Sequence, residues 1–257
     1  MIFYVFYRIT NTLPYHKNLQ LLYNENMADY KHILIDMDDT LLDFGKSEKK
    51  AFAALCSVHG RPWDEDMYRS YSATNLSLWK GLERQEYDKA GLLLRRGRYM
   101  AELTGIDLHP DDINREFMGI MKDCAELLPG ALDFVKDLRF IVPDVRIVTN
   151  GTTITAEGRY KASGLCDLIE HIYISDKIGF HKPSAEFWNY VVADTGDQDL
   201  SSYLVIGDSL TSDITGALSY GFDACLYTSR GSFPAGYEKY QIKYLCDSYE
   251  CVLSAIR

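Results

Sequence analysis

Apolar and polar residues change their spacing several times along the chain, and the first informative stretch is a short apolar run at residues 32–35. This run ends at two carboxylates, Asp36 and Asp38. Such a run is typical of a buried parallel strand, in which side chains two residues apart point to the same side. Asp36 and Asp38 can therefore share one small volume beyond the strand end, where open α/β sheets bind ligands. The alternative at this point is a strand that runs into an Asp-rich turn.

The next part of the chain, residues 46–127, shows helical spacing and no convincing strand. On the second helix of this part, Asn75 is the odd member of an otherwise mostly apolar face. Its amide either bonds a neighbouring backbone group, which is the interpretation that we favour, or faces a ligand. The predicted helices span about 46–60, 64–82, 86–103 and 111–127, and the break at 128–130 (Leu-Pro-Gly) returns the chain to the sheet.

From Ala131 onward, helical and strand patterns alternate, which predicts an α/β fold with a doubly wound parallel sheet. Pro183 is expected to open a helix at its first position. The all-helical block then interrupts the sheet after its first strand and is placed to cover the strand ends as a lid. The predicted strands are 145–148, 172–174, 203–206 and 224–227, and the last predicted helix contains 252–256.

These patterns divide the chain into a core, over residues 27–44 and 129–257, and an inserted helical cap over residues 45–128. Residues 1–26 look unlike the start of a domain, and we interpret them as an appendage. We expect the chain from Met27 to fold and act alone.

The formal net charge is −10, and neither Lys nor Arg is massed in any part of the chain. This argues against a protein that coats a nucleic-acid polymer or a membrane surface, and it requires local groups to hold an anionic substrate. Six scattered cysteines without a C-x-x-C pair are typical of a reducing cytosol. We find no apolar run of membrane-spanning length and no signal-peptide pattern. We therefore expect a cytoplasmic monomer or homodimer.

Three of the expected strands end in polar residues of complementary kinds, and parallel strands bring such ends to the same edge of a sheet. Together they offer carboxylates for a divalent metal, a hydroxyl and an amide for hydrogen bonds, and one fixed cation. A phosphoryl group in transfer needs such parts around its oxygens. The residues are Asp36, Asp38, Thr149, Asn150, Lys182 and Asp208.

This ordered set resembles the four motifs of the haloacid dehalogenase-like (HAD) hydrolase superfamily over residues 30–257. The motifs correspond to residues 36–40, residues 149–151, Lys182 and residues 207–213. The helical insertion is similar to the four-helix cap of this superfamily.

Within the superfamily, the chain resembles the noncanonical pyrimidine nucleotidases. After Cys225 those relatives often carry a Trp and an Asn, where this chain has Leu226 and Thr228. The resemblance rests on Asp39, residues 41–44, Asn75 with Leu78-Trp79, residues 97–99 and residues 179–183.

The resemblance implies that Asp36 attacks phosphorus to form an aspartyl-phosphate, and that Asp38 acts first as general acid and then as general base. It also implies that Lys182 pairs with Asp36 and keeps that carboxylate ionised. Thr40 is expected to cap the turn after the strand, and Asp39 to be solvated. By the same resemblance, Mg²⁺ is held by Asp36, Asp208 and the backbone of Asp38 with Asp213 nearby, and the phosphoryl group by Thr149, Asn150, Gly151 and Lys182.

The expected activity is Mg²⁺-dependent hydrolysis of a phosphomonoester, with a nucleoside 5′-monophosphate as the implied substrate. Asn75, Trp79 and Arg98 are candidates for substrate selectivity; the alternatives are that Trp79 is cap core and that Arg98 pairs with Glu102. A sugar-phosphate phosphatase or a phosphomutase on the same core, and a non-enzymatic phosphate sensor, remain alternatives. Dehalogenases of the superfamily lack the second carboxylate of the first motif, so the presence of Asp38 argues against that reaction.

Overall fold

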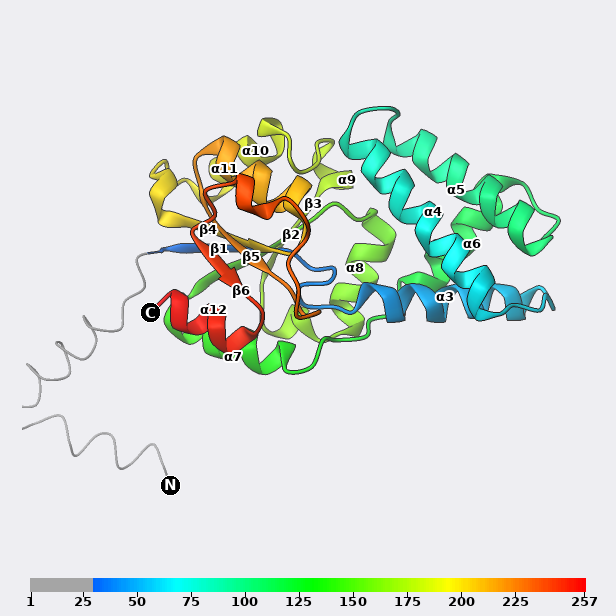
Figure 1. Cartoon of the computed structure of the whole chain (residues 1–257), viewed down its shortest axis with the longest axis horizontal. Helices are drawn as coiled ribbons and strands as arrows, with labels where there is room; N and C mark the ends of the chain where they lie inside the picture. The colour runs from blue at the N-terminus through cyan, green and yellow to red at the C-terminus, as the bar shows by residue number, and fades with distance from the viewer. Residues whose placement is uncertain (1–29) are drawn as a thin grey trace, which may run out of the picture.

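The computed structural model describes residues 30–257, and the expectations for residues 1–26 and for a start at Met27 lie outside this range. Within it, six parallel strands form one sheet in the order β3-β2-β1-β4-β5-β6 (Figure 1). The strand order changes direction between β1 and β4, so β3-β2-β1 form one half of the sheet and β4-β5-β6 the other. The strands are β1 (His32–Ile35), β2 (Asp144–Thr149), β3 (His171–Ile174), β4 (Tyr203–Gly207), β5 (Asp223–Tyr227) and β6 (Tyr244–Cys246).

Helices cover both faces of the sheet, as the alternating pattern predicts. On β1, Ile33 and Ile35 join the apolar cluster under α7, α8 and α12, whereas Leu34 joins the cluster under α10 and α11. This alternation confirms the doubly wound α/β fold. The helices of the core are α7 (Ala131–Ile141), α8 (Thr153–Ala162), α9 (Ser175–Ile178), α10 (Ala185–Thr195), α11 (Thr215–Tyr220) and α12 (Tyr249–Ala255).

Four helices form the layer beside the sheet, at the right of Figure 1, around a separate apolar cluster that includes Phe52 and Tyr71. Asp43, Asp64 and Asp88 each cap one of them by accepting a hydrogen bond from a backbone N–H of the first turn. These caps explain where the helices begin, and why the third starts at Lys89 and not at 86. The four are α3 (Phe44–Val58), α4 (Glu65–Glu83), α5 (Lys89–Thr104) and α6 (Pro110–Met121).

The two connections between the sheet and this helical layer run side by side. The Asp43 N–H donates to the Glu126 carbonyl at 2.7 Å, and the Leu128 N–H donates to the Leu41 carbonyl at 3.0 Å. The residues after Met121 are needed for this pairing, so α6 ends there, and its predicted extension to 127 is wrong.

Two further differences from the sequence-based expectation have local causes. Ser184, not Pro183, precedes α10: its side chain accepts a hydrogen bond from the Phe187 N–H, so Pro183 lies before the helix. Strand β6 was not expected because it has three residues, and Leu245 at its centre is 41% exposed. Single-turn elements lie at 165–167, 200–202, 210–214 and 237–239.

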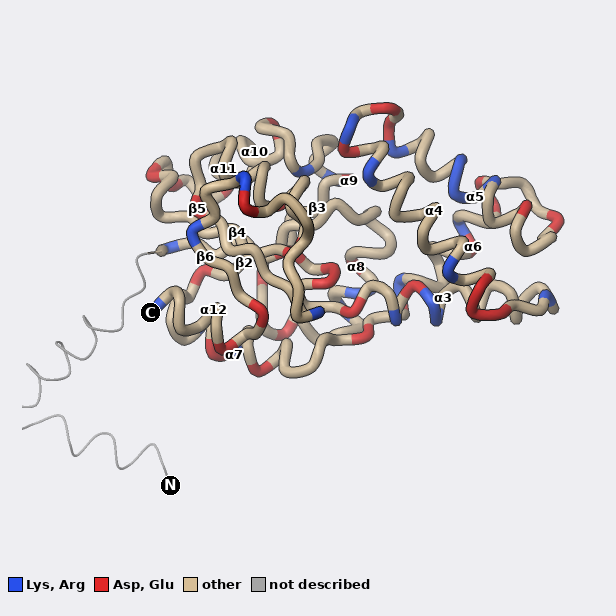
Figure 2. Tube along the Cα trace, viewed as in Figure 1, with Lys and Arg blue, Asp and Glu red and all other residues tan. Residues whose placement is uncertain are grey.

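Acidic and basic residues are interspersed along the described trace, in the sheet layer and in the helical layer alike (Figure 2). In residues 30–257, no helix combines the length and the apolar character that crossing a membrane requires.

Candidate active site

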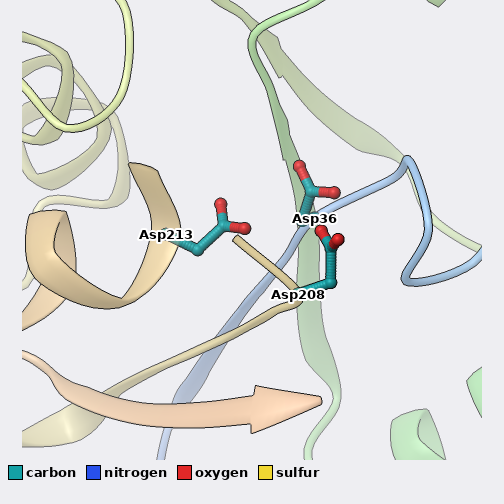
Figure 3. A group of neighbouring side chains, drawn as sticks. All are labelled: Asp36, Asp208 and Asp213. Atoms are coloured by element: carbon teal, nitrogen blue, oxygen red, sulfur yellow. The ribbon is translucent and has the colours of Figure 1, made fainter. Parts of the chain in front are cut away.

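Three carboxylates converge beyond the C-terminal ends of β1 and β4 (Figure 3). Asp36 follows β1, Asp208 follows β4, and Asp213 lies in the helical turn at 210–214. One oxygen from each lies within 4.8 Å of the others. Gly207 permits this approach, since a Cβ atom at that position would lie 2.3 Å from an Asp213 carboxylate oxygen.

Lys182 is the cation of this cluster and is almost completely buried. Its Nζ donates to Asp36 Oδ1 at 2.6 Å, to Asp213 Oδ1 at 2.6 Å and to the Val148 carbonyl at 2.9 Å. An ammonium group has three N–H donors, so all of them are already hydrogen-bonded to oxygen atoms of the protein. A phosphoryl oxygen that binds Lys182 must therefore share or replace one of these contacts.

The side chain of Asn150 holds Lys182 in place rather than facing a ligand with its amide. Asn150 Nδ2 donates to the Lys182 carbonyl, and Asn150 Oδ1 accepts from the Lys182 N–H, each at 2.9 Å. The Thr149 hydroxyl accepts from the Gly151 N–H at 3.1 Å. The second motif thus orders the loop after β2 and fixes the backbone of Lys182.

The electrostatics of the cluster favour a bound cation. Burial raises the pKa of Asp36 to about 8, although Lys182 opposes the shift, and the charges of Asp213 and Asp38 add to it. Burial also raises the pKa of Asp208 well above its ordinary value, again with Asp36 contributing. The predicted ion pair between Lys182 and Asp36 is present and lowers the pKa of Asp36, while burial and the neighbouring carboxylates raise it.

The donor set fits a divalent metal ion. Three carboxylates and one ammonium leave a formal charge of −2 when all are ionised, and carboxylate oxygens are the ligands that Mg²⁺ prefers. A divalent cation would neutralise this charge and return Asp36 and Asp208 to their ionised forms.

Asp38 lies at the edge of the cluster and is held by Arg159, a residue that we did not predict. The Arg159 guanidinium is buried, pairs with Asp38 through Nη1, and donates from Nε to the Cys124 carbonyl at 3.0 Å. Arg159 shares the buried face of α8 with Ala156 and Tyr160, at spacings i−3 and i+1. An arginine on an otherwise apolar helix face was the available signal.

Two other residues of the first motif differ from their expected roles. Asp39 is not simply solvated: it accepts a hydrogen bond from Arg230 at 2.7 Å, and its φ of +55° places it in the left-handed region. Thr40 is buried, but its hydroxyl has no hydrogen-bond partner among residues 30–257, so it does not cap the turn. The Thr40 carbonyl instead accepts from the Tyr249 hydroxyl at 2.8 Å.

A cavity of about 530 Å³ connects the carboxylate cluster to the helical layer. Asn75 and Trp79 of α4 line it. The Asn75 amide donates to the side chain of Glu48 at 2.6 Å and not to a backbone group, which corrects the interpretation that we favoured from the sequence. Arg98 is exposed and does not line it; Arg96 does so instead. The difference is one of helical phase, since Arg96 lies on the buried face of α5 between Leu92 and Met100.

The helical layer also contacts the core directly beside this cavity. Lys89, at the start of α5, donates to the carbonyls of Asn150 (3.1 Å) and Gly151 (3.3 Å) and to the Ser175 hydroxyl (2.9 Å). On the other side, the Thr211 hydroxyl donates to Glu83 at 2.7 Å. Both contacts connect a cap helix end to a loop that carries site residues.

Comparison with known proteins agrees with this geometry. The family model of haloacid dehalogenase-like hydrolases matches residues 30–221. The chain belongs to this family. It is therefore a hydrolase, and Mg²⁺ dependence and an aspartyl-phosphate intermediate are general features of HAD enzymes.

Two curated relatives are 31% identical to the chain over 199 residues, which is 77% of this chain and 84% of each relative. They are the HAD-hydrolase YfnB of Bacillus subtilis and the pyrimidine 5′-nucleotidase PynA of Streptococcus pneumoniae. The pyrimidine 5′-nucleotidase YjjG of Escherichia coli is 27% identical over 196 residues, 75% of this chain and 84% of YjjG. A crystal structure of YfnB bound to magnesium superimposes with a TM-score of 0.81 at 28% identity, covering 89% of this chain and 99% of that one.

Proposed function

We propose that this HAD hydrolase is a Mg²⁺-dependent phosphatase that removes the phosphate of nucleoside 5′-monophosphates. The observation that carries the proposal is that Asp36, paired with Lys182, and Asp38 both line the core end of a cavity whose other end is lined by cap residues. Two relatives named pyrimidine 5′-nucleotidases support the substrate class. The second carboxylate, Asp38, argues against a dehalogenase.

In this proposal Asp36 is the nucleophile. Its carboxylate oxygen bonds to phosphorus as the bond from phosphorus to the ester oxygen breaks, and Asp38 gives its proton to the departing alkoxide. Asp38 then takes a proton from water, whose oxygen attacks phosphorus and releases inorganic phosphate and free Asp36. Arg159 positions Asp38. Lys182 and the loop 149–151 bind the phosphoryl group and stabilise its negative charge.

Asp36, Asp208 and Asp213, with the backbone carbonyl of Asp38, would hold the Mg²⁺ ion. When bound, the ion supplies positive charge that keeps the carboxylates ionised and offsets the charge of the phosphoryl oxygens. We assign the chemistry to the core (27–44 and 129–257) and substrate selection to the cap (45–128). We expect the enzyme to act in the cytoplasm as a monomer or homodimer.

The test is release of inorganic phosphate by the purified protein with Mg²⁺ on a panel of phosphomonoesters. The panel contains UMP, CMP, AMP, ribose 5-phosphate, glucose 6-phosphate and p-nitrophenyl phosphate. We expect the highest kcat/KM on a nucleoside monophosphate, complete loss of activity in EDTA and recovery with Mg²⁺. Highest kcat/KM on a sugar phosphate, or isomerisation of a sugar phosphate without phosphate release, would contradict the nucleotidase assignment.

A further inference from the structure

The cap end of the cavity carries a cluster of buried polar residues that the phosphoryl chemistry does not use. Glu48 of α3, Asn75 of α4 and Arg96 of α5 all line the cavity and are 1%, 2% and 5% exposed. Three different helices thus each place one polar side chain at the same end of one cavity. Polar side chains this deeply buried normally have all their hydrogen bonds satisfied.

Glu48 determines how Asn75 is oriented. Asn75 Nδ2 donates to Glu48 Oε1 at 2.6 Å, and Glu48 Oε2 accepts from the Tyr68 hydroxyl at 3.2 Å. The carboxylate selects the NH₂ end of the amide, because the opposite orientation would bring two acceptor oxygens together. Asn75 Oδ1 is left as a buried acceptor without a hydrogen-bond partner in residues 30–257.

Arg96 is positioned in a comparable way and keeps unused donors. Its Nε donates to Asn114 Oδ1 at 2.7 Å, and the guanidinium carbon lies 5.2 Å from the centroid of the Phe117 ring. Its Nη2 is buried without a hydrogen-bond partner among residues 30–257, although the charge of Glu48 acts on the guanidinium. A buried donor atom without a partner is destabilising, and a ligand that accepts from Nη2 would remove this cost.

The residues that carry this acceptor and this cationic donor, Asn75 and Arg96, line the cap end of the cavity, while Asp36 and Lys182 line the core end. A volume of about 530 Å³ is in the range of small-molecule sites, so one ligand can occupy both ends. With the phosphate at the core end, the group that reaches Asn75 and Arg96 is the far part of the leaving group. To satisfy both atoms, it presents a hydrogen-bond donor to Asn75 Oδ1 and an acceptor to Arg96 Nη2.

Building on the function proposed above, we propose that Asn75 and Arg96 recognise the base of the nucleotide through its imide edge, as found in uracil and thymine. Asn75 Oδ1 accepts from the ring N3–H, and Arg96 donates to an adjacent carbonyl oxygen. Glu48 is a positioning residue that fixes the Asn75 amide. Sites built to hydrogen-bond a substrate N–H or O–H discriminate strongly against analogues that lack it.

The first test needs no variant. Wild-type enzyme with Mg²⁺ is assayed for kcat/KM on UMP, on N3-methyl-UMP and on ribose 5-phosphate. N3-methylation replaces the N–H with a methyl group, and ribose 5-phosphate lacks the base. We expect about tenfold or greater losses of kcat/KM for both analogues. Equal use of UMP and N3-methyl-UMP would overturn the proposal.

The second test uses Asn75→Ala and Arg96→Met, with Arg98→Met as the matched control because Arg98 is an exposed arginine on the same helix. We expect the first two variants to lose about tenfold or more in kcat/KM on UMP and less than about threefold on ribose 5-phosphate. Asn75→Ala should also reduce the discrimination between UMP and N3-methyl-UMP, and Arg98→Met should change neither substrate.

Equal losses on UMP and ribose 5-phosphate would show that Asn75 and Arg96 are structural. Arg96→Lys keeps the charge and serves as the second variant if thermal unfolding shows that Arg96→Met is not folded. Failure of the proposed function gives a different result, since wild-type enzyme would then prefer ribose 5-phosphate or glucose 6-phosphate to every nucleotide. Preference for UMP together with unaffected Asn75 and Arg96 variants would overturn the base-recognition proposal alone.

Discussion

The two ends of the cavity differ in whether their buried polar groups have hydrogen-bond partners within the protein. At the core end, Lys182 donates three hydrogen bonds to protein acceptors. Both the NH₂ group and the oxygen of the Asn150 amide are hydrogen-bonded to the backbone of Lys182. At the cap end, Asn75 and Arg96 each keep a buried atom without a partner. Charges that are fixed before substrate arrives suit a phosphoryl group, which all phosphomonoesters share. Unsatisfied groups suit recognition, because the correct leaving group is what satisfies them.

The largest expected effect comes from removing the nucleophile at the core end. Asp36→Asn should lower kcat by about 10⁴-fold or more, and on UMP and p-nitrophenyl phosphate alike, because every substrate uses the same nucleophile. Phosphate release under saturating substrate measures this. Asp39→Asn is the control, since Asp39 also lines the cavity but pairs with Arg230 at the surface, and it should retain activity within about tenfold of wild type.

Retention of more than about a hundredth of the wild-type rate by Asp36→Asn would exclude Asp36 as the nucleophile. A loss confined to nucleotides would also break the comparison, because it would give a core residue the behaviour expected of the cap.

The second-largest loss of activity is expected from replacing Lys182. Lys182→Ala is expected to lower kcat/KM by about 10²–10³-fold, and Lys182→Arg should not restore it, because a planar guanidinium does not fit between Asp36, Asp213 and the Val148 carbonyl. The alanine variant should also lose about 3–5 kcal/mol of unfolding free energy in EDTA, since it removes the cation that pairs with the buried Asp213 carboxylate. Chemical denaturation and steady-state kinetics measure the two effects.

Lys177→Ala is the matched control for Lys182, because Lys177 makes an exposed ion pair with Glu157 and should affect neither quantity. Near-normal turnover of Lys182→Arg would mean that the site needs a positive charge but not the contacts of an ammonium group.

The carboxylates at the core end also predict a pH dependence of stability. The pKa of Asp36 is raised to about 8, so the metal-free folded protein keeps a proton that the unfolded chain loses near pH 4. This contribution to stability is complete below about pH 4 and is lost as the pH rises towards 8. In EDTA, Tm should therefore fall between pH 5 and pH 8 by about 5 °C or more, given that about 1 kcal/mol shifts Tm by about 2–4 °C at this size.

Asp36→Asn should flatten this slope, and the increase in Tm caused by Mg²⁺ should grow with pH in the wild type, because the metal replaces the proton. Differential scanning fluorimetry at several pH values measures both. A wild-type slope that Asp36→Asn leaves unchanged would locate the pH dependence elsewhere.

The sequence predicted the core end of the site well because its residues follow strands, and the strand order alone brings their ends together. Asp36 and Asp208 follow adjacent strands β1 and β4, so no knowledge of side-chain packing was needed. The strand pattern could not reveal the hydrogen bonds between side chains and backbone in the site. One example is the contact of the Asn150 amide with the backbone of Lys182, which joins residues 32 positions apart.

The cap end was predicted less well, although a signal was present. Glu48, Arg96 and Arg159 each lie at helical spacing within a mostly apolar face, Glu48 with Ala51 and Phe52, for example. Asn75 was identified by this criterion, whereas these three charged residues were not singled out. Arg96 and Arg98 differ by about 200° around a helix, so the choice between them depends on a helical phase that the Arg-rich segment 95–98 does not reveal.

The smallest effect is expected from a residue at the contact between the helical cap and the core. Lys89 holds the cap to the loop after β2 through the carbonyls of Asn150 and Gly151, yet burial lowers its pKa and Asp176 is its nearest carboxylate, at 3.7 Å. Lys89→Met should raise KM by about 2- to 10-fold, the range that corresponds to about 0.5–1.5 kcal/mol of lost hydrogen bonding.

This rise in KM should be equal for UMP and ribose 5-phosphate, because a looser cap affects every substrate that it covers. Arg84→Met is the control, since Arg84 pairs with Glu86 at the surface of the cap and should leave KM unchanged. Steady-state kinetics of both variants on both substrates measure this. If Lys89→Met instead impaired UMP alone, Lys89 would belong with Asn75 and Arg96 in recognition, and the division between a fixed core end and a selective cap end would have to include the contact between them.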